Sequence, residues 1–325
     1  MKFLSRRVYR SVKATIVRSV GILWIISNVL ASPVAAQKAV DNPEVIGVIS
    51  GSVTGTYARF AHQMSVVLDS SQIRVLPMLG KGSQQNLRDL LYLNGIDIAI
   101  VQSDVLDYYR STNELPGIED SIRYITKLYN EEIHVVVSES VRSIKELEGE
   151  IVSVGSAGSG TEMTAINMFS ALGVNFLPAN MSNAEALDAV KQGLIKAAVF
   201  VVGKPATVIQ EINETDGLAL LRLDMPKSAQ AAFFSSELTH QDYPALIPEG
   251  QSVSTISVGA VLAVFNWSED SARHDALTVF SERLVEALDL LKTPGIYHPK
   301  WQEVEISTEV PGWKRFSAMQ RLISN

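Results

Sequence analysis

Residues 44–57, EVIGVISGSVTGTY, and residues 73–87, IRVLPMLGKGSQQNL, share one plan that points to the fold class. Each begins with an apolar run typical of a buried strand, passes through glycine and hydroxyl residues, and enters a run with helical spacing. Residues 96–104, IDIAIVQSD, add a third strand-like run that ends in helix-capping residues. This alternation of strands and helices predicts a mostly parallel, doubly wound sheet.

The same alternation returns later in the chain. Residues 150–161, EIVSVGSAGSGT, run from a strand into a third glycine-rich loop, and residues 195–205, IKAAVFVVGKP, form a strand that ends in a proline turn. The chain has 325 residues, which is more than one hydrophobic core usually supports. We therefore expect an α/β protein with two lobes, each a doubly wound, mostly parallel sheet flanked by helices. The tail aromatics Trp301, Trp313 and Phe316 are expected to pack in the core.

The first 36 residues have the order of a secretory signal peptide. Six basic residues and no acidic residue accompany an apolar run at 21–31, and the small residues Val34, Ala35 and Ala36 are typical of a cleavage site. The apolar run is too short to span a bilayer. We therefore expect export to the periplasm. The alternative is an uncleaved segment that tethers the protein to the membrane.

Removal of residues 1–36 leaves an acidic chain. The 22 basic and 35 acidic residues that remain give a net charge of −13. This charge argues against nucleic acid or an anionic membrane as a partner. The chain contains no cysteine, and its five histidines show no metal-ligand spacing, so we expect neither a metal nor a cofactor.

Loops that follow parallel strands are expected to meet at one rim, because ligands of doubly wound sheets bind beyond the carboxyl ends of the strands. Helix starts at this rim offer unpaired N–H groups and partial positive charge, which suit a small anion such as a carboxylate. The predicted ligand-binding residues are Ser52, Thr54, Gly55, Thr56, Tyr57, Gly82, Ser83, Asn86, Gln102, Ser103, Asp104, Ser156, Gly158, Ser159, Gly160, Thr161, Gly203 and Lys204.

Several of these side chains have an alternative role. Lys204, like Lys81, suits the neutralisation of a carboxylate, although an exposed lysine without a ligand is the more common case. Tyr57 suits stacking on a ligand, but its helical spacing equally suits the core. Asp104 suits a helix cap better than contact with an anion, and a ligand amino group is the other partner that it could receive.

The sequence lacks residues that common enzyme motifs require. A phosphate-binding loop would require a serine or threonine after Lys81 and a glycine at position 75, and neither is present. The dinucleotide-binding pattern that begins at Gly158 has Met163 in place of its third glycine. No clean G-x-S-x-G elbow supplies a serine nucleophile. We therefore expect a binding protein and not an enzyme.

The loops together resemble the solute-binding subunits of tripartite ATP-independent periplasmic (TRAP) transporters, in the subfamily called TAXI. The resemblance covers roughly residues 45–265, and its pieces run in family order. They are residues 51–57, 82–87, 101–104, 129–137, 154–161 and 200–205. The first loop departs from the family pattern at Ser52 and Val53, where the family is usually richer in glycine.

The resemblance implies a two-lobed periplasmic binding protein. One lobe would hold residues 37–138 and 255–325, the other would hold residues 139–254, and a hinge would lie near 137–141 and 251–256. It also implies capture of a small carboxylate, such as glutamate or a dicarboxylate, for delivery to a TRAP permease that an ion gradient drives. Two other functions stay open: a periplasmic sensor that reports its ligand to a membrane kinase, and a hydrolase or transferase that uses the same cleft.

Overall fold

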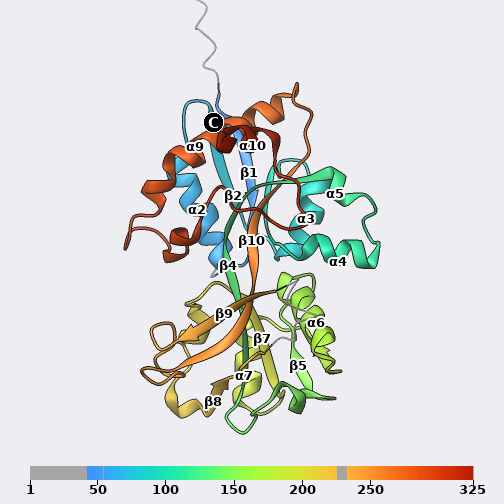
Figure 1. Cartoon of the computed structure of the whole chain (residues 1–325), viewed down its shortest axis with the longest axis vertical. Helices are drawn as coiled ribbons and strands as arrows, with labels where there is room; N and C mark the ends of the chain where they lie inside the picture. Colours follow the sequence, from blue (N-terminus) through green and yellow to red (C-terminus); the bar gives the residue numbers. More distant parts are fainter. Residues whose placement is uncertain (1–41, 54, 225–232, 325) are drawn as a thin grey trace, which may run out of the picture. The chain divides into compact units, whose positions relative to one another are not determined.

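The structure is a computed structural model that describes residues 42–53, 55–224 and 233–324. Residues 43–325 form one compact unit, shown with its two lobes in Figure 1. The signal peptide predicted at residues 1–36 lies outside the described residues and stays a prediction. None of the helices in the described ranges has the length and apolar character needed to cross a membrane.

The first lobe follows the predicted alternation of strands and helices. Strands β1, β2 and β3 pair in parallel, in the order β2-β1-β3. Helix α2 buries Phe60, Met64 and Leu68 at helical spacing, which packs its apolar face on the sheet. The elements are β1 (Glu44–Ile49), α2 (Thr56–Leu68), β2 (Ile73–Met78), α3 (Ser83–Tyr92), β3 (Ile98–Gln102), α4 (Val105–Thr112) and α5 (Ile118–Ser121).

The second lobe repeats the plan with shorter strands. Strands β5, β6 and β7 are parallel, and β7 pairs with β5. Its elements are η1 (Ile144–Leu147), β5 (Ile151–Ser153), α6 (Gly160–Leu172), β6 (Leu177–Ala179), α7 (Asn183–Lys191), β7 (Ala197–Val202), α8 (Thr207–Gln210), η2 (Glu214–Asp216), β8 (Leu218–Leu220) and β9 (Phe234–Thr239).

Two long strands, β4 (Ile122–Ser138) and β10 (Ser252–Phe265), run through both lobes (Figure 1). They pair antiparallel with each other; β10 also pairs antiparallel with β3, and β4 with β7. The sheet order is therefore β2-β1-β3-β10-β4-β7-β5-β6. The predicted α/β class is confirmed, but the sheet is mixed because the crossing strands oppose the parallel strands of each lobe.

The hydrophobic cores change along these crossing strands. Leu128 and Tyr129 of β4 belong to the core beneath α2, whereas Ile133 belongs to the core beneath α6. On β10 the same change falls between Val258 and Ala260. The crossing thus lies several residues before the expected hinge on β4 and slightly after it on β10. The exact lobe boundaries stay a prediction.

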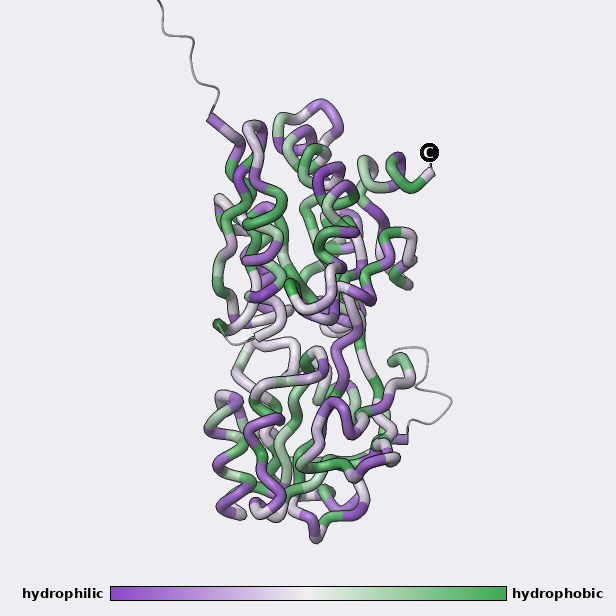
Figure 2. Tube along the Cα trace, turned by 90° about the vertical axis from the view of Figure 1, so that its left-hand side faces the viewer, coloured by the Kyte–Doolittle hydropathy of each residue, from purple (hydrophilic) through white to green (hydrophobic). Residues whose placement is uncertain are grey.

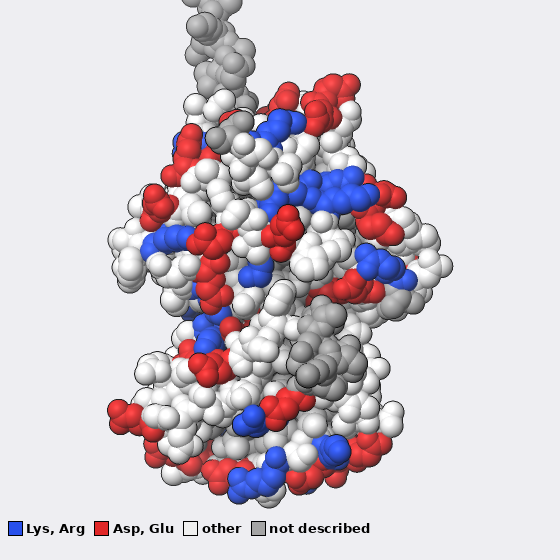
Figure 3. All heavy atoms as spheres, in the orientation of Figure 1, with Lys and Arg blue, Asp and Glu red and all other residues white. Residues whose placement is uncertain are grey.

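The C-terminal segment returns to the first lobe, where it forms α9 (Ala272–Leu291), η4 (Pro299–Glu303) and α10 (Ser317–Ser324). Trp301 stacks on Phe60, and Trp313 and Phe316 are also buried, which confirms their predicted place in the core. Figure 2 shows pale, weakly polar segments where the two lobes face one another. Figure 3 shows acidic and basic side chains intermingled over one face.

Candidate ligand-binding pocket

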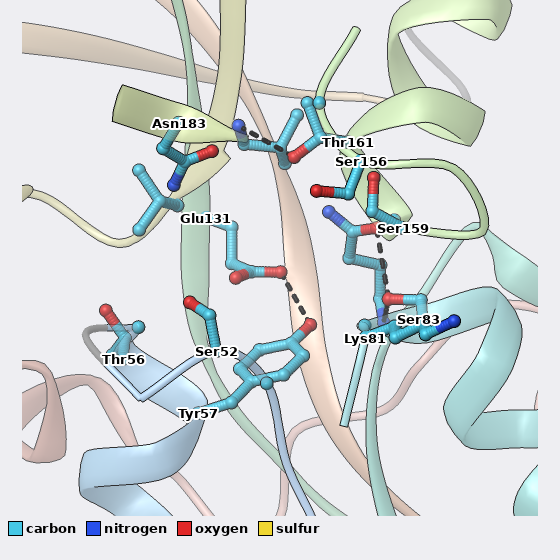
Figure 4. Close-up of a pocket in the computed structure, with 18 of the residues that line it drawn as sticks. Ser52, Thr56, Tyr57, Lys81, Ser83, Glu131, Ser156, Ser159, Thr161 and Asn183 are labelled. Atoms are coloured by element: carbon cyan, nitrogen blue, oxygen red, sulfur yellow. Dashed lines mark hydrogen bonds between the residues drawn. The ribbon is translucent and has the colours of Figure 1, made fainter. Parts of the chain in front are cut away.

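A pocket of about 350 Å³ lies where loops of both lobes meet (Figure 4). The loops after β1, β2, β5 and β6 bring the N-terminal ends of α2, α3, α6 and α7 to its walls. A volume of this size suits a small molecule. Its lining consists of Gly51, Ser52, Gly55, Thr56, Tyr57, Lys81, Gly82, Ser83, Gln102, Glu131, Gly155, Ser156, Ser159, Gly160, Thr161, Ser182, Asn183, Ala184, Val201 and Val202.

The structure brings most of the predicted ligand-binding residues together in this lining. Thr54 lies outside the described residues. A role in ligand binding stays a prediction for all of them. The predicted residues that line the pocket are Ser52, Gly55, Thr56, Tyr57, Gly82, Ser83, Gln102, Ser156, Ser159, Gly160 and Thr161.

Three long helices begin at the pocket wall. The N-cap residues of α2 and α3 are Gly55 and Gly82, and neither supplies a side-chain cap hydrogen bond. At α6 the hydroxyl of Ser159 accepts a hydrogen bond from Glu162 N at 3.2 Å. The first N–H groups of a helix have no intrahelical acceptor and carry partial positive charge. The glycine caps therefore leave donors that a ligand oxygen can reach.

The starts of α3 and α6 approach each other closely at Gly82 and Gly160. A Cβ atom on Gly160 would lie 1.7 Å from Gln102 Oε1 and 2.6 Å from Ser83 Oγ. These two side chains are tied together, because Ser83 Oγ donates to Gln102 Oε1 at 3.1 Å and accepts from Gln102 N at 2.8 Å. A side chain at position 160 would require Gln102 and Ser83 to shift, so glycine permits this close contact between the lobes.

Glu131 of β4 places a carboxyl group in the pocket. The residue is 4% exposed, and its Oε2 accepts a 2.8 Å hydrogen bond from the hydroxyl of Tyr57. Burial raises the pKa of Glu131 to about 8, and the hydrogen bond from Tyr57 opposes this shift. Tyr57 packs in the core of the first lobe and also lines the pocket. The ring of Tyr57 thus belongs to the core, whereas its hydroxyl group bonds to Glu131 at the pocket.

Lys81 is the basic residue of the lining. Its side chain is exposed, and within the described ranges it forms no ion pair. A lysine in this state is available to a ligand carboxylate at the rim.

The loop after β7, with Gly203 and Lys204, lies outside the pocket lining. Lys204 lies outside the lining, because its Nζ donates to Asp242 Oδ2 at 3.1 Å and to Glu237 O at 2.6 Å. Gly203 packs against Tyr129 and Lys300, where an added Cβ would lie 3.0 Å from Tyr129 Cε2. In this region Val201 and Val202 line the pocket instead.

Three further predicted residues have structural partners outside the pocket. Asn86 donates from Nδ2 to Ser50 O and to Ile100 O, which ties α3 to β1 and β3. Ser103 Oγ accepts from Gly259 N at 3.0 Å and so fixes β3 to β10. Gly158 forms a turn with φ of 76°, and its carbonyl accepts from Gln85 N.

Asp104 lies at the start of α4 and outside the pocket lining. It occupies the N-cap position of α4 without a side-chain cap bond. Its Oδ2 accepts a 2.8 Å hydrogen bond from Thr164 Oγ1 on α6, and among the described residues its Oδ1 has no partner. Burial raises the pKa of Asp104 to about 7. Asp104 therefore links the two lobes through Thr164, and its role in ligand binding stays a prediction.

The sequence reasoning missed several lining residues. Ser182 and Asn183 follow the short strand β6, which Pro178 obscures, although the capping box from Ser182 to Glu185 marks the start of α7. In the sequence, Glu131 stands at the start of an apolar run that reads as a buried strand, so it is not recognised as a pocket residue. Two adjacent acidic residues in a strand that is otherwise buried are the signal that points to it. The missed residues are Gly51, Glu131, Gly155, Ser182, Asn183, Ala184, Val201 and Val202.

Residues 48–293 match the model of the NMT1-like family, and the match includes every residue of the pocket lining. The chain belongs to the NMT1-like family. Pocket, glycine-capped helix starts and crossing strands all fall inside the matched region of this NMT1-like protein.

Solved structures that resemble the NMT1-like protein do so distantly. An ancestral arginine-binding protein bound to arginine has a TM-score of 0.49 and 13% identity, and the match covers 81% of this chain and 98% of that chain. A TctC solute binding protein from Polaromonas has a TM-score of 0.46 and 13% identity, with 80% and 86% covered. The effector binding domain of QuiR in complex with shikimate has a TM-score of 0.44 and 14% identity, with 75% and 98% covered. Likeness at this level says nothing about the ligand of this NMT1-like protein.

Proposed function

We propose that this protein is a periplasmic solute receptor of the TAXI subfamily that captures a small carboxylate and delivers it to a TRAP permease. The carboxylate belongs to an amino acid such as glutamate or to a dicarboxylate. Residues 1–36 direct export as a cleaved signal peptide. Residues 37–138 and 255–325 form one lobe and residues 139–254 the other, with the boundaries adjusted to the crossing of β4 and β10.

The observation that carries this proposal is the convergence of three helix starts on one pocket. The N-terminal ends of α2, α3 and α6 come from both lobes and line the same space of about 350 Å³. Helix N-termini bind anions through free N–H groups and partial positive charge. Lys81 adds a full positive charge at the rim. This combination suits the carboxylate end of a small solute.

Closure of the lobes over the solute is the proposed working step. A ligand shifts an equilibrium between open and closed forms only as far as it binds one form better. Contacts from Gly55 and Ser83 in one lobe and from Thr161 in the other are available together only when the lobes are close. The hydrogen bonds from Gln85 N to Gly158 O and from Thr164 Oγ1 to Asp104 Oδ2 join the lobes beside the pocket.

The first prediction concerns Ser159 and Thr161 at the start of α6. We expect Ser159→Ala and Thr161→Ala to weaken solute binding by about tenfold each, because each removes a hydroxyl from the pocket wall. Isothermal titration calorimetry of the exported full chain measures the affinity, and urea denaturation measures the stability of each variant.

Ser271→Ala is the matched control for Ser159→Ala. Ser271 caps α9 through the same type of bond, to His274 N at 3.2 Å, but it lies away from the pocket. Both cap losses should lower stability by about 1 kcal/mol. Only Ser159→Ala should also lower affinity. Wild-type affinity in both pocket variants would contradict the proposed site.

A further inference from the structure

The wall of the proposed carboxylate pocket contains an acidic residue, Glu131, which would repel a carboxylate when ionised. Figure 4 shows Glu131 directed into the pocket from β4, with one carboxyl oxygen bonded to the hydroxyl of Tyr57. The other oxygen, Oε1, has no hydrogen bond to the described residues, although the side chain is almost fully buried. Oε1 does not belong to the buried polar atoms that lack a partner in the described part of the chain, so it is open to the space of the pocket. The open side of Glu131 therefore faces the place of a ligand.

The charges around Glu131 favour a cation at this point. The acidic groups Asp104 and Glu132 act on Glu131 electrostatically, as does Lys300 with opposite sign. Lys300 is already bound by Glu132 Oε1 at 2.8 Å and by Glu303 Oε1 at 2.7 Å. Among the described residues, no basic side chain forms an ion pair with Glu131. Glu131 therefore has no basic partner of its own among these groups.

The hydroxyl of Tyr57 holds Glu131 in place without neutralising it. Tyr57 and Tyr129 lie near Glu131, and burial raises the pKa of each phenol well above its usual value, so both stay protonated. Tyr57 is therefore the donor in its bond to Glu131 and fixes the orientation of the carboxyl group. It leaves Oε1 free for a second donor.

We propose that Glu131 binds the ammonium group of the solute, and that the receptor therefore selects amino acids over dicarboxylates. This inference rests on the proposed receptor function and narrows its ligand class. The carboxylate of the amino acid lies at the glycine-capped helix starts and Lys81, and the ammonium group lies at Glu131. A pocket with donors on one wall and a buried acceptor on another matches a zwitterion, because each end meets its opposite charge.

The proposal predicts a proton release when the amino acid binds. With its raised pKa, Glu131 is largely protonated in the empty pocket at neutral pH, and it must lose this proton to pair with an ammonium group. Affinity for an amino acid should thus rise by up to about tenfold per pH unit between roughly pH 6 and pH 8. A dicarboxylate would need Glu131 protonated as a donor, so its affinity would stay nearly constant up to about pH 7 and would fall as the pH rises through about 8.

The experiment compares amino acids with their analogues that lack the amino group. The exported full chain is screened by thermal shift against the common L-amino acids and short dicarboxylates, including the matched pair L-glutamate and glutarate. Calorimetry at several pH values then gives the affinity and proton release for the solutes that bind. We expect an amino acid to bind about 10- to 100-fold more tightly than its analogue, because a charge-assisted hydrogen bond is lost in the analogue.

Variants of Glu131 separate its role from its contribution to folding. Glu131→Gln should weaken amino acid binding about 10- to 100-fold and abolish the proton release, while binding of dicarboxylates is not weakened. Tyr57→Phe should have a smaller effect, because Tyr57 only positions Glu131. The control Glu139→Gln removes the same charge at an exposed site and should leave binding unchanged. Circular dichroism checks that each variant is folded.

The outcomes distinguish this inference from the receptor function on which it rests. Tight binding of a dicarboxylate, with affinity that falls as pH rises, would overturn the role of Glu131 and leave the receptor intact. Unchanged amino acid affinity in Glu131→Gln would do the same. Failure of both classes to bind would overturn both proposals.

Discussion

At the scale of single residues, the buried carboxyl groups give the molecule an unusual pH dependence. Burial raises the pKa of Asp104 to about 7 and of Glu131 to about 8. In an unfolded chain such groups titrate near pH 4. The folded, ligand-free protein therefore holds protons that the unfolded chain has already released. Its stability is highest below the unfolded values and falls as pH rises through the folded values.

Two buried histidines act in the opposite direction at lower pH. Burial lowers the pKa of His134 and of His298 to about 4, whereas an unfolded histidine has a pKa near 6.5. The stability that these neutral histidines contribute is lost as pH falls from about 6.5 to about 4. The effect of the two carboxyl groups is therefore best separated above about pH 6.5.

We predict that the free energy of unfolding of the ligand-free protein decreases between about pH 6.5 and pH 8.5. The slope is at most about 1.4 kcal/mol per pH unit for each titrating group. Asp104→Asn should remove part of this slope, because an amide does not titrate and can still accept from Thr164. Urea denaturation at several pH values measures the slope. The exposed control Asp188→Asn should retain it, and an equal slope in Asp104→Asn and wild type would contradict the assignment.

At the scale of elements, the contact that brings the two lobes together at the pocket is the one between the starts of α3 and α6. Ser83 and Gln102 present a bonded pair of side chains, and Gly160 lies against them without a Cβ atom. The backbone of α6 can then approach α3 closely enough for both helix starts to line one pocket. A side chain at position 160 would overlap the side chains of Gln102 and Ser83 and would require them to move.

We predict that Gly160→Ala weakens solute binding by about tenfold or more while the protein stays folded. Overlap with Gln102 and Ser83 opposes closure, whereas alanine itself is favourable in a helix. Calorimetry measures affinity, and urea denaturation measures stability.

A second substitution tests this explanation. Gln102→Ala removes the atom nearest to the new methyl group. The loss of binding free energy in the double variant, Gln102→Ala with Gly160→Ala, should therefore be smaller than the sum of the losses in the two single variants. Strict additivity of the two losses would contradict the steric explanation.

At the scale of the whole molecule, Glu132 ties together segments that are far apart in the chain. Its Oε1 accepts from Lys300 Nζ in the C-terminal segment, and its Oε2 accepts from Lys204 N in the loop after β7 at 2.9 Å. Glu132 and Lys300 are both 3% exposed in their side chains. This buried ion pair lies at the crossing between the lobes, and both of its members act electrostatically on Glu131.

We predict that Lys300→Met destabilises the protein by about 3–5 kcal/mol, because it leaves Glu132 buried without its counter-charge. Urea denaturation near neutral pH measures this loss. Arg321→Met breaks the exposed pair with Glu269 and serves as the control, with an expected cost of about 1 kcal/mol or less. Similar costs for the two variants would show that the buried pair is not essential at the crossing.

The sequence by itself determined the α/β class and the loops that form most of the pocket. Apolar runs followed by glycine-rich turns and helical spacing are local patterns. The strands and helices of residues 44–104 can therefore be predicted from the sequence without information on tertiary contacts. The sequence also predicts that the loops at 51–56, 80–83, 102–104, 155–161 and 203–205 meet at one rim, because all five follow strands. Their function as a binding site remains to be tested by the variants above.

Only the tertiary structure decided which polar side chains face the pocket. Lys204 and Asn86 resemble ligand contacts in the sequence but are bound by Asp242 and by backbone carbonyls. Glu131 resembles part of a buried strand and proves to line the pocket. The physical reason is that a polar group takes whichever partner the fold brings within hydrogen-bond distance, and these partners lie up to 74 residues away along the chain.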